Sequence, residues 1–163
     1  MQNTGQTANQ VTVPAGSSGS TGGGTFDVSD GTAVTKSIAY AAAAAQIAQM
    51  SSANGPGGGT VACAWAVNQV LDSTGLPPLD TNSVQSMEEA LEAGRGALVV
   101  PSQAVAGDIV IQAQDGHVGI CMNDGCTQVI SNSSSNASFT WVSNTSFSPS
   151  YSGGPGRIYQ VNH

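Results

Sequence analysis

The sequence predicts an α+β domain, in which helices come first and a small antiparallel sheet follows. Apolar residues recur at helical spacing over residues 35–50 and again after Cys63. Beyond Pro101 the pattern changes to short segments rich in β-branched residues, separated by turn sequences such as QDG and NDG. Helices followed by several short strands are typical of α+β folds, and 163 residues suffice for one such domain.

The first 33 residues are expected to form a disordered tail or linker. Residues 1–26 carry no charged side chain and consist mainly of Gly, Ser, Thr, Asn and Gln. Such a segment has too little apolar surface to offset the entropy lost on ordering. We therefore expect a single folded domain over residues 34–163.

Three helices are predicted ahead of the sheet. The first covers residues 35–50, is rich in alanine, and ends at the sequence SSANGPGGG. Cys63 opens the second, on an apolar stripe with Val67 and Val70, and the third follows Ser83 as its N-cap. The predicted strands are GDIVIQA (107–113), HVGICM (117–122), TQVIS (127–131), SFTWVS (138–143) and RIYQV (157–161).

Charge excludes two classes of partner. The formal net charge is −7, and the basic residues are Lys36, Arg95 and Arg157 against ten acids. Nucleic acids and anionic membrane surfaces both require a basic footprint, so neither is an expected partner. The alanine-rich segment is too short and too polar to span a bilayer, so no membrane insertion is expected. We expect a monomer.

Cys63 stands where a run of glycines meets the start of the second predicted helix. Unpaired N–H groups and the helix dipole at such a position favour negative charge, which predicts a thiol pKa lowered towards neutrality. The N–H of Cys63 could also face an oxyanion. The alternative is a buried core cysteine, because Cys63 also lies on the apolar stripe.

His117 follows a DG turn at the start of a predicted strand, and the other histidine, His163, ends the chain. An imidazole there would be rigidly held and reachable, as the base of a cysteine nucleophile must be. The alternative is an ordinary turn histidine. Zinc is not expected, because His117 and Cys121 would lie roughly 13 Å apart along a strand. Cys121 and Cys126 flank the loop MNDG, so either a disulfide or two free thiols fits.

The order of these motifs resembles the papain-like cell-wall hydrolases, namely the NlpC-type peptidases and the CHAP-type amidases. The resemblance covers residues 35 to about 145. PSQAVAGDIVI and GHVGI are similar to the NlpC-type pattern, whereas Ala62-Cys63-Ala64-Trp65 is closer to the Cys-x-Trp of CHAP-type enzymes. The resemblance implies a papain-like fold, Cys63 as nucleophile and His117 as general base, without a metal or cofactor.

The resemblance also implies a third residue that orients the histidine. NlpC-type enzymes commonly use a second His there and CHAP-type enzymes an acid or Asn, but this chain reads TQVISNSSSN. The position falls at Ser131 or Asn132. We predict Asn132, because an amide oxygen can accept the imidazole N–H and fix its tautomer. The alternative is an Asn in a polar turn.

The predicted function is hydrolysis of peptidoglycan amides, by a cysteine endopeptidase or amidase acting on stem peptides or cross-links. The alternative is a catalytically silent binding or structural module on the same scaffold, in a phage particle or secreted assembly. Residues 1–30 lack the basic start and apolar stretch of a secretory signal. The expected location is nevertheless secreted or in the cell envelope, which includes an injected effector or a phage-associated protein.

Overall fold

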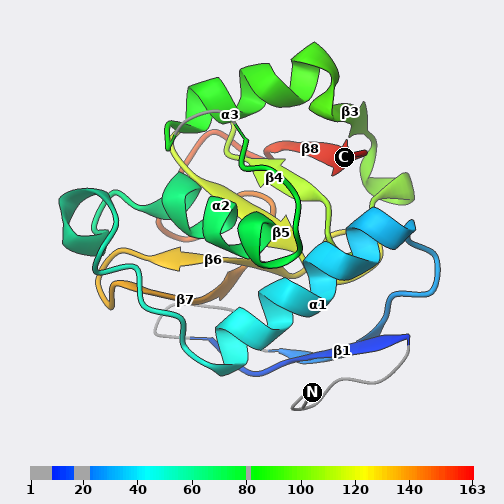
Figure 1. The fold of residues 1–163 in the computed structure, drawn as a ribbon, viewed down its shortest axis with the longest axis horizontal. Coiled ribbons are helices and arrows are strands. Elements are labelled where there is room, and N and C mark those ends of the chain that lie inside the picture. Colours follow the sequence, from blue (N-terminus) through cyan, green and yellow to red (C-terminus); the bar gives the residue numbers. More distant parts are fainter. Residues whose placement is uncertain (1–8, 17–22, 80–81) are drawn as a thin grey trace.

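The fold is α+β, as predicted, and is built around one antiparallel sheet (Figure 1). The computed structural model describes residues 9–16, 23–79 and 82–163. The six strands have the spatial order β3-β8-β4-β5-β6-β7, and every neighbouring pair is antiparallel. Their bounds are β3 Gly96–Val99, β4 Ile109–Ile111, β5 Val118–Cys121, β6 Val129–Ser133, β7 Ser138–Ser143 and β8 Arg157–Val161. Of these, β3 was not predicted.

Helices α1 (Ala33–Ile47) and α2 (Cys63–Ser73) lie across one face of the sheet (Figure 1). Thr32 caps α1, because its side chain accepts the N–H of Thr35 and the Thr35 side chain accepts the N–H of Thr32. The helix therefore begins two residues before the predicted start. α2 begins at Cys63, as predicted, after a glycine-rich 3-10 turn, η1 (Pro56–Gly59).

Helix α3 (Val84–Ala90) has its predicted cap, Ser83, and continues into a π-helical turn, η2 (Leu91–Arg95). The turn η2 lies beside β3 and β8, and α3 is at the top of Figure 1. A further 3-10 turn, η3 (Pro101–Gln103), leads from β3 towards β4. The predicted helical segment 83–94 is thus confirmed, with a change of helix type near its end.

The sheet separates two apolar cores. Between helices and sheet lie Ile38, Leu71, Ile120 and other aliphatic side chains, all removed from solvent. On the opposite face of the sheet, the aromatic side chains of Trp141 and Phe147 pack with Val110, Val129 and Ile158. Cys121 and Cys126 belong to this second core and form a disulfide, with their Cα atoms 5.1 Å apart. The sequence left that pairing open.

Within residues 9–16 and 23–33, the structure shows an ordered hairpin in place of the expected disordered tail. Strands β1 (Gln10–Val13) and β2 (Gly24–Asp27) pair as an antiparallel hairpin that runs beneath α1 (Figure 1). Val11, Val13 and Val28 are buried, because the alternation of apolar and polar residues turns one side of the hairpin towards the small alanines of α1. The folded unit therefore begins well before residue 34, and residues 1–8 and 17–22 lie outside the described part.

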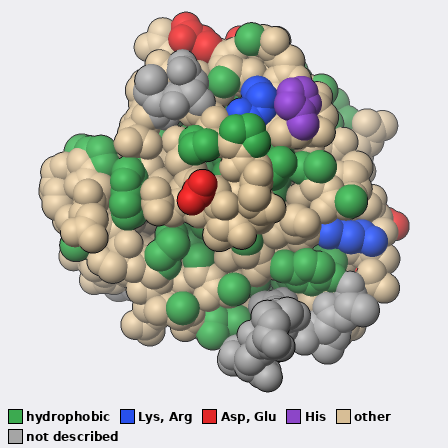
Figure 2. Space-filling model, viewed as in Figure 1, with side chains coloured by type: hydrophobic (Ala, Val, Ile, Leu, Met, Phe, Trp, Pro, Cys, Tyr) green, Lys and Arg blue, Asp and Glu red, His purple; other side chains and the backbone are tan. Residues whose placement is uncertain are grey.

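The surface seen from the helix side carries few charges. Figure 2 shows isolated acidic and basic side chains there, among polar and scattered hydrophobic ones. Among the described residues, no helix combines the length and apolar character that crossing a membrane requires.

Candidate active site

Cys63 is the first residue of α2 and opens onto a cleft of about 530 Å³, whose lining also includes His117 and Asn132. Left-handed backbone at Gly57 and Gly58, both with φ of 66°, turns the chain sharply into the helix. The other two cysteines are joined, so Cys63 is the free thiol of the chain. The cleft therefore contains a thiol at a helix N-terminus, as the sequence predicted.

The protonation state of Cys63 differs from the prediction. Burial raises the pKa of the Cys63 thiol above its ordinary value of 9.0, although the backbone N–H groups of Ala64, Val118 and Cys63 itself favour the thiolate. The expectation of a lowered pKa is wrong, because the helix-end contribution is smaller than the cost of removing a thiolate from water. With its pKa raised above 9.0, Cys63 is a neutral thiol at pH 7.

His117 lies immediately before β5 in a tightly bonded turn. The Gln112 side-chain oxygen accepts the N–H of Gly116 at 3.0 Å, and the backbone N–H of Gln112 donates to the carbonyl oxygen of His117 at 2.9 Å. His117 is only 5 % exposed, and its ring is surrounded by Trp141, Phe147 and Tyr151, with centroid distances of 4.8–5.4 Å. This burial lowers the pKa of His117 to about 4, so the imidazole is uncharged at neutral pH.

Both ring nitrogens of His117 face hydroxyl groups. Nε2 lies 2.9 Å from Ser131 Oγ, and Nδ1 lies 3.3 Å from the Tyr151 hydroxyl oxygen. Ser131 reaches the ring because β6 pairs closely with β5, with Ser131 opposite Gly119. A side chain at Gly119 would meet Val129 at 2.7 Å and the Ile130 carbonyl oxygen at 2.8 Å, so only glycine permits this approach.

The structure corrects the prediction that Asn132 orients the histidine. Its Nδ2 donates to the carbonyl oxygen of Gly59 at 2.9 Å, which ties β6 to the glycine-rich turn before Cys63. Adjacent residues of a strand point to opposite sides, so Ser131 and Asn132 cannot both reach the ring. Ser131, the alternative from the sequence, holds Nε2, while Asn132 lines the same cleft as Cys63 and His117.

Acidic groups dominate the charge near the cleft. Asp115 borders it and forms an ion pair with Arg157, which also pairs with the largely buried carboxylate of Glu88. Sequence reasoning missed Tyr151, because its contact with His117 depends on the path of the Ser- and Gly-rich loop after β7. Trp141, for which the sequence left a groove position or core packing open, lies on β7 and packs against the His117 ring. Within the described residues, no group of three or more His, Cys, Asp or Glu side chains is placed to hold a metal.

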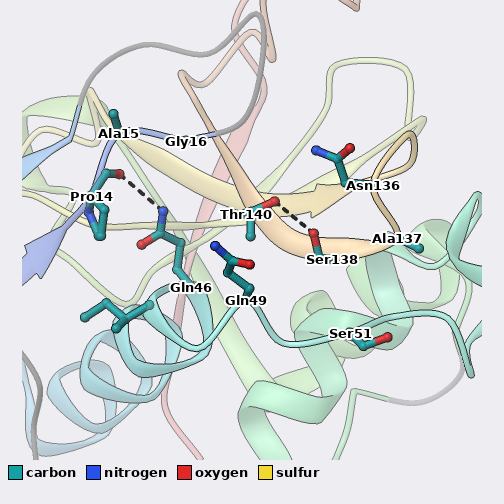
Figure 3. Close-up of a pocket in the computed structure, with 11 residues that line it drawn as sticks. Pro14, Ala15, Gly16, Gln46, Gln49, Ser51, Asn136, Ala137, Ser138 and Thr140 are labelled. Atoms are coloured by element: carbon teal, nitrogen blue, oxygen red, sulfur yellow. Dashed lines mark hydrogen bonds between the residues drawn. The ribbon is translucent and has the colours of Figure 1, made fainter.

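A larger hollow of about 640 Å³ lies elsewhere, between the end of α1, the segment after β1 and the start of β7 (Figure 3). Gln46 Nε2 donates to the carbonyl oxygen of Pro14 at 3.2 Å there, and Ser138 and Thr140 share a hydrogen bond of 3.0 Å. Neither Cys63 nor His117 lines this hollow. The hydrogen bond between Gln46 and Pro14 ties the segment after β1 to α1, and the candidate site is the cleft that Cys63 and His117 line.

The cleft thus brings together the two residues that the sequence singled out, Cys63 and His117, and adds Ser131 and Tyr151 as partners of the imidazole. Such an arrangement can deliver a thiol to a bound carbonyl and take up its proton. Comparison with protein-family models, with curated protein sequences and with solved structures gave no match to this chain.

Proposed function

We propose that this protein is a cysteine hydrolase with a papain-like arrangement, which cleaves amide bonds in the stem peptides or cross-links of bacterial peptidoglycan. The observation that carries the proposal is the common cleft of Cys63 and His117. Acyl transfer by a cysteine needs a nucleophile, a base and a residue that orients the base. Here the nucleophile is at the start of a helix, the histidine is at the start of a strand packed under that helix, and the orienting residue is on the next strand.

The hydrogen bonds of His117 define a mechanism. When the Nε2 proton is donated to Ser131 Oγ, the lone pair of Nδ1 remains available as a base. Cys63 attacks the amide carbonyl carbon while Nδ1 takes the thiol proton, and N–H groups at the start of α2 stabilise the oxyanion. His117 then protonates the leaving amine, and water releases the acyl group from Cys63 with His117 as its base.

The resting site holds both groups uncharged, so proton transfer accompanies the attack instead of preceding it. Burial raises the pKa of Cys63 and lowers the pKa of His117, which makes a preformed thiolate–imidazolium pair unfavourable. The Tyr151 hydroxyl also forms a hydrogen bond with Nδ1 of His117, and this bond has to break before the thiol can reach Nδ1. No cofactor takes part in this scheme.

The proposed place of action is outside the cytoplasm, in a secreted or envelope-associated protein. The disulfide between Cys121 and Cys126 supports this, because such bonds persist mainly in oxidising compartments. The net charge of −7 does not favour a nucleic acid as the substrate.

A second candidate is a binding module without catalysis. The specific observation that favours it is the state of His117, whose basic nitrogen is occupied by Tyr151 and whose pKa is lowered to about 4. A base that weak takes a thiol proton only when substrate binding rearranges the site.

Digestion of purified peptidoglycan separates the two candidates. Wild type, Cys63→Ala and His117→Ala are incubated with several wall types, and the released fragments are identified by mass spectrometry. The hydrolase predicts new fragments from wild type alone, with masses that name the bond. Fragments from none of the three, together with retained binding to the insoluble wall, would leave the binding module as the function.

A further inference from the structure

We propose that a small pocket beside His117 is a subsite for one N-acetylated sugar ring of the substrate, an inference that rests on the proposed hydrolase function. This sugar pocket has a volume of about 310 Å³ and is lined by Asn132, Trp141, Tyr151 and the serines at 133–135 and 150, with His117 on its inner wall. It joins the cleft of Cys63, because His117, Asn132 and Tyr151 border both.

The lining chemistry indicates an uncharged ligand with many hydrogen-bonding groups. Four serine hydroxyls and one amide surround the pocket, and within the described residues no carboxylate, Lys or Arg lines it. His117 adds no charge at neutral pH. A peptide segment bearing carboxylates or amines finds no counter-charge there, whereas the hydroxyl and acetamido groups of a sugar find donors and acceptors.

Two aromatic rings complete the pocket. Trp141 and Tyr151 lie with ring centroids 6.4 Å apart and planes inclined at 30°, and both border the pocket. Aromatic rings with a polar edge present an apolar surface next to hydrogen-bonding groups. The C–H face of a pyranose ring requires this combination, since its hydroxyl groups point outward around an apolar face.

An independent observation comes from Asn132. Its side chain is fixed by the hydrogen bond from Nδ2 to the Gly59 carbonyl oxygen, and the residue is 1 % exposed. Its Oδ1 has no hydrogen-bond partner within the described part of the chain. A buried acceptor without a donor is unfavourable, and the N–H of an acetamido group would satisfy it.

The size of the pocket limits what binds. At about 310 Å³ it is at the small end of ligand sites, which span roughly 300–1,000 Å³, so it accepts a single ring with its substituent. Because the pocket opens directly beside His117, the bound sugar lies next to the cleaved bond. This placement favours the amide that attaches the stem peptide to the glycan over an amide within a cross-link.

Binding to the Cys63→Ala variant tests the subsite without turnover. The probe is N,N′-diacetylchitobiose, with cellobiose as the matched sugar that lacks acetamido groups, and affinity is measured by calorimetry. We expect cellobiose to bind at least tenfold more weakly. Adding Ser135→Leu, an exposed change inside the sugar pocket, should weaken diacetylchitobiose binding at least tenfold. Asn136→Leu, at the next exposed position but outside that pocket, is the control and should change little.

Turnover by wild type distinguishes failure of the subsite from failure of the proposed function. A disaccharide-tetrapeptide from peptidoglycan should be cleaved with a kcat/KM at least tenfold above that of any amide in the free tetrapeptide. Equal cleavage of both, without diacetylchitobiose binding, would overturn the subsite and leave the hydrolase intact. Sugar binding without cleavage of either would retain the subsite and overturn the hydrolase. Equal binding by the Ser135→Leu and Asn136→Leu variants would place the sugar elsewhere and overturn the subsite.

Discussion

Alkylation of Cys63 reports on the protonation state of the proposed nucleophile. Because Cys121 and Cys126 form a disulfide, iodoacetamide under non-reducing conditions labels one position in the folded chain. Burial raises the pKa of Cys63 above 9.0, and only the thiolate reacts. At pH 7 the pH lies at least about two units below that pKa, so the thiolate fraction is about one in a hundred or less.

The assay measures the alkylation rate between pH 6 and pH 10 by intact-protein mass spectrometry. We expect the rate to rise about tenfold per pH unit up to pH 8.5, without a plateau below pH 9. His117→Gln should change the rate at pH 7 by less than about threefold, because a neutral imidazole stabilises a thiolate only weakly. A plateau with its midpoint at or below pH 7, abolished by His117→Gln, would show a preformed ion pair and refute this reasoning.

Three further predictions concern stability and the orientation of the imidazole. Burial raises the pKa of Asp108 to about 7, so between pH 4 and pH 7 this carboxyl ionises in the unfolded chain but stays protonated in the folded protein. The free energy of unfolding therefore falls as pH rises through this range, by up to about 4 kcal/mol by pH 7. Burial lowers the pKa of His117 to about 4, so stability falls by up to about 3 kcal/mol as pH drops from 6.5 to 4. The two effects oppose each other, and urea unfolding at several pH values separates them. On acidification, Asp108→Asn should lose stability relative to wild type, whereas His117→Gln should gain stability relative to wild type. If the free energy of unfolding varied with pH in the same way for all three proteins, both pKa shifts would be contradicted. Ser131→Ala should lower kcat about tenfold or more with little change in KM, because Nε2 loses its partner, and an unchanged kcat would exclude Ser131 as the orienting residue. Replacing Cys121 and Cys126 by serine should lower the free energy of unfolding by about 2 kcal/mol for so short a loop, and an unchanged urea midpoint would show that the disulfide does not stabilise the fold.

Local signals predicted the helices and most of the strands. The cap at Ser83, the apolar stripe after Cys63 and the turn before His117 depend on residues a few positions apart, and the structure confirms each element. The hairpin of β1 and β2 was missed because its apolar alternation is short and surrounded by Gly, Ser and Thr. The three buried valines become favourable only once α1 offers a surface of small side chains.

The sequence predicted that Cys63 and His117 share a cleft, but it did not predict the surroundings of either residue. The order of Cys63 and His117 along the chain indicated a shared cleft, and both residues line one. Which of Ser131 and Asn132 reaches the imidazole depends on strand register, which the sequence alone left open. The pKa of Cys63 depends on burial by distant segments, and the loop that carries Tyr151 to His117 has no periodic signal.

The central claim is that Cys63 forms a covalent acyl intermediate with a peptidoglycan amide. The most direct test is acid quenching of wild-type protein during turnover of disaccharide-peptides, followed by intact-mass analysis and peptide mapping. The proposed mechanism predicts a transient mass increase equal to the acyl part of the substrate, located on Cys63 and absent from Cys63→Ala. Product formation by the Cys63→Ala variant at the wild-type rate, with no adduct on wild type, would contradict it.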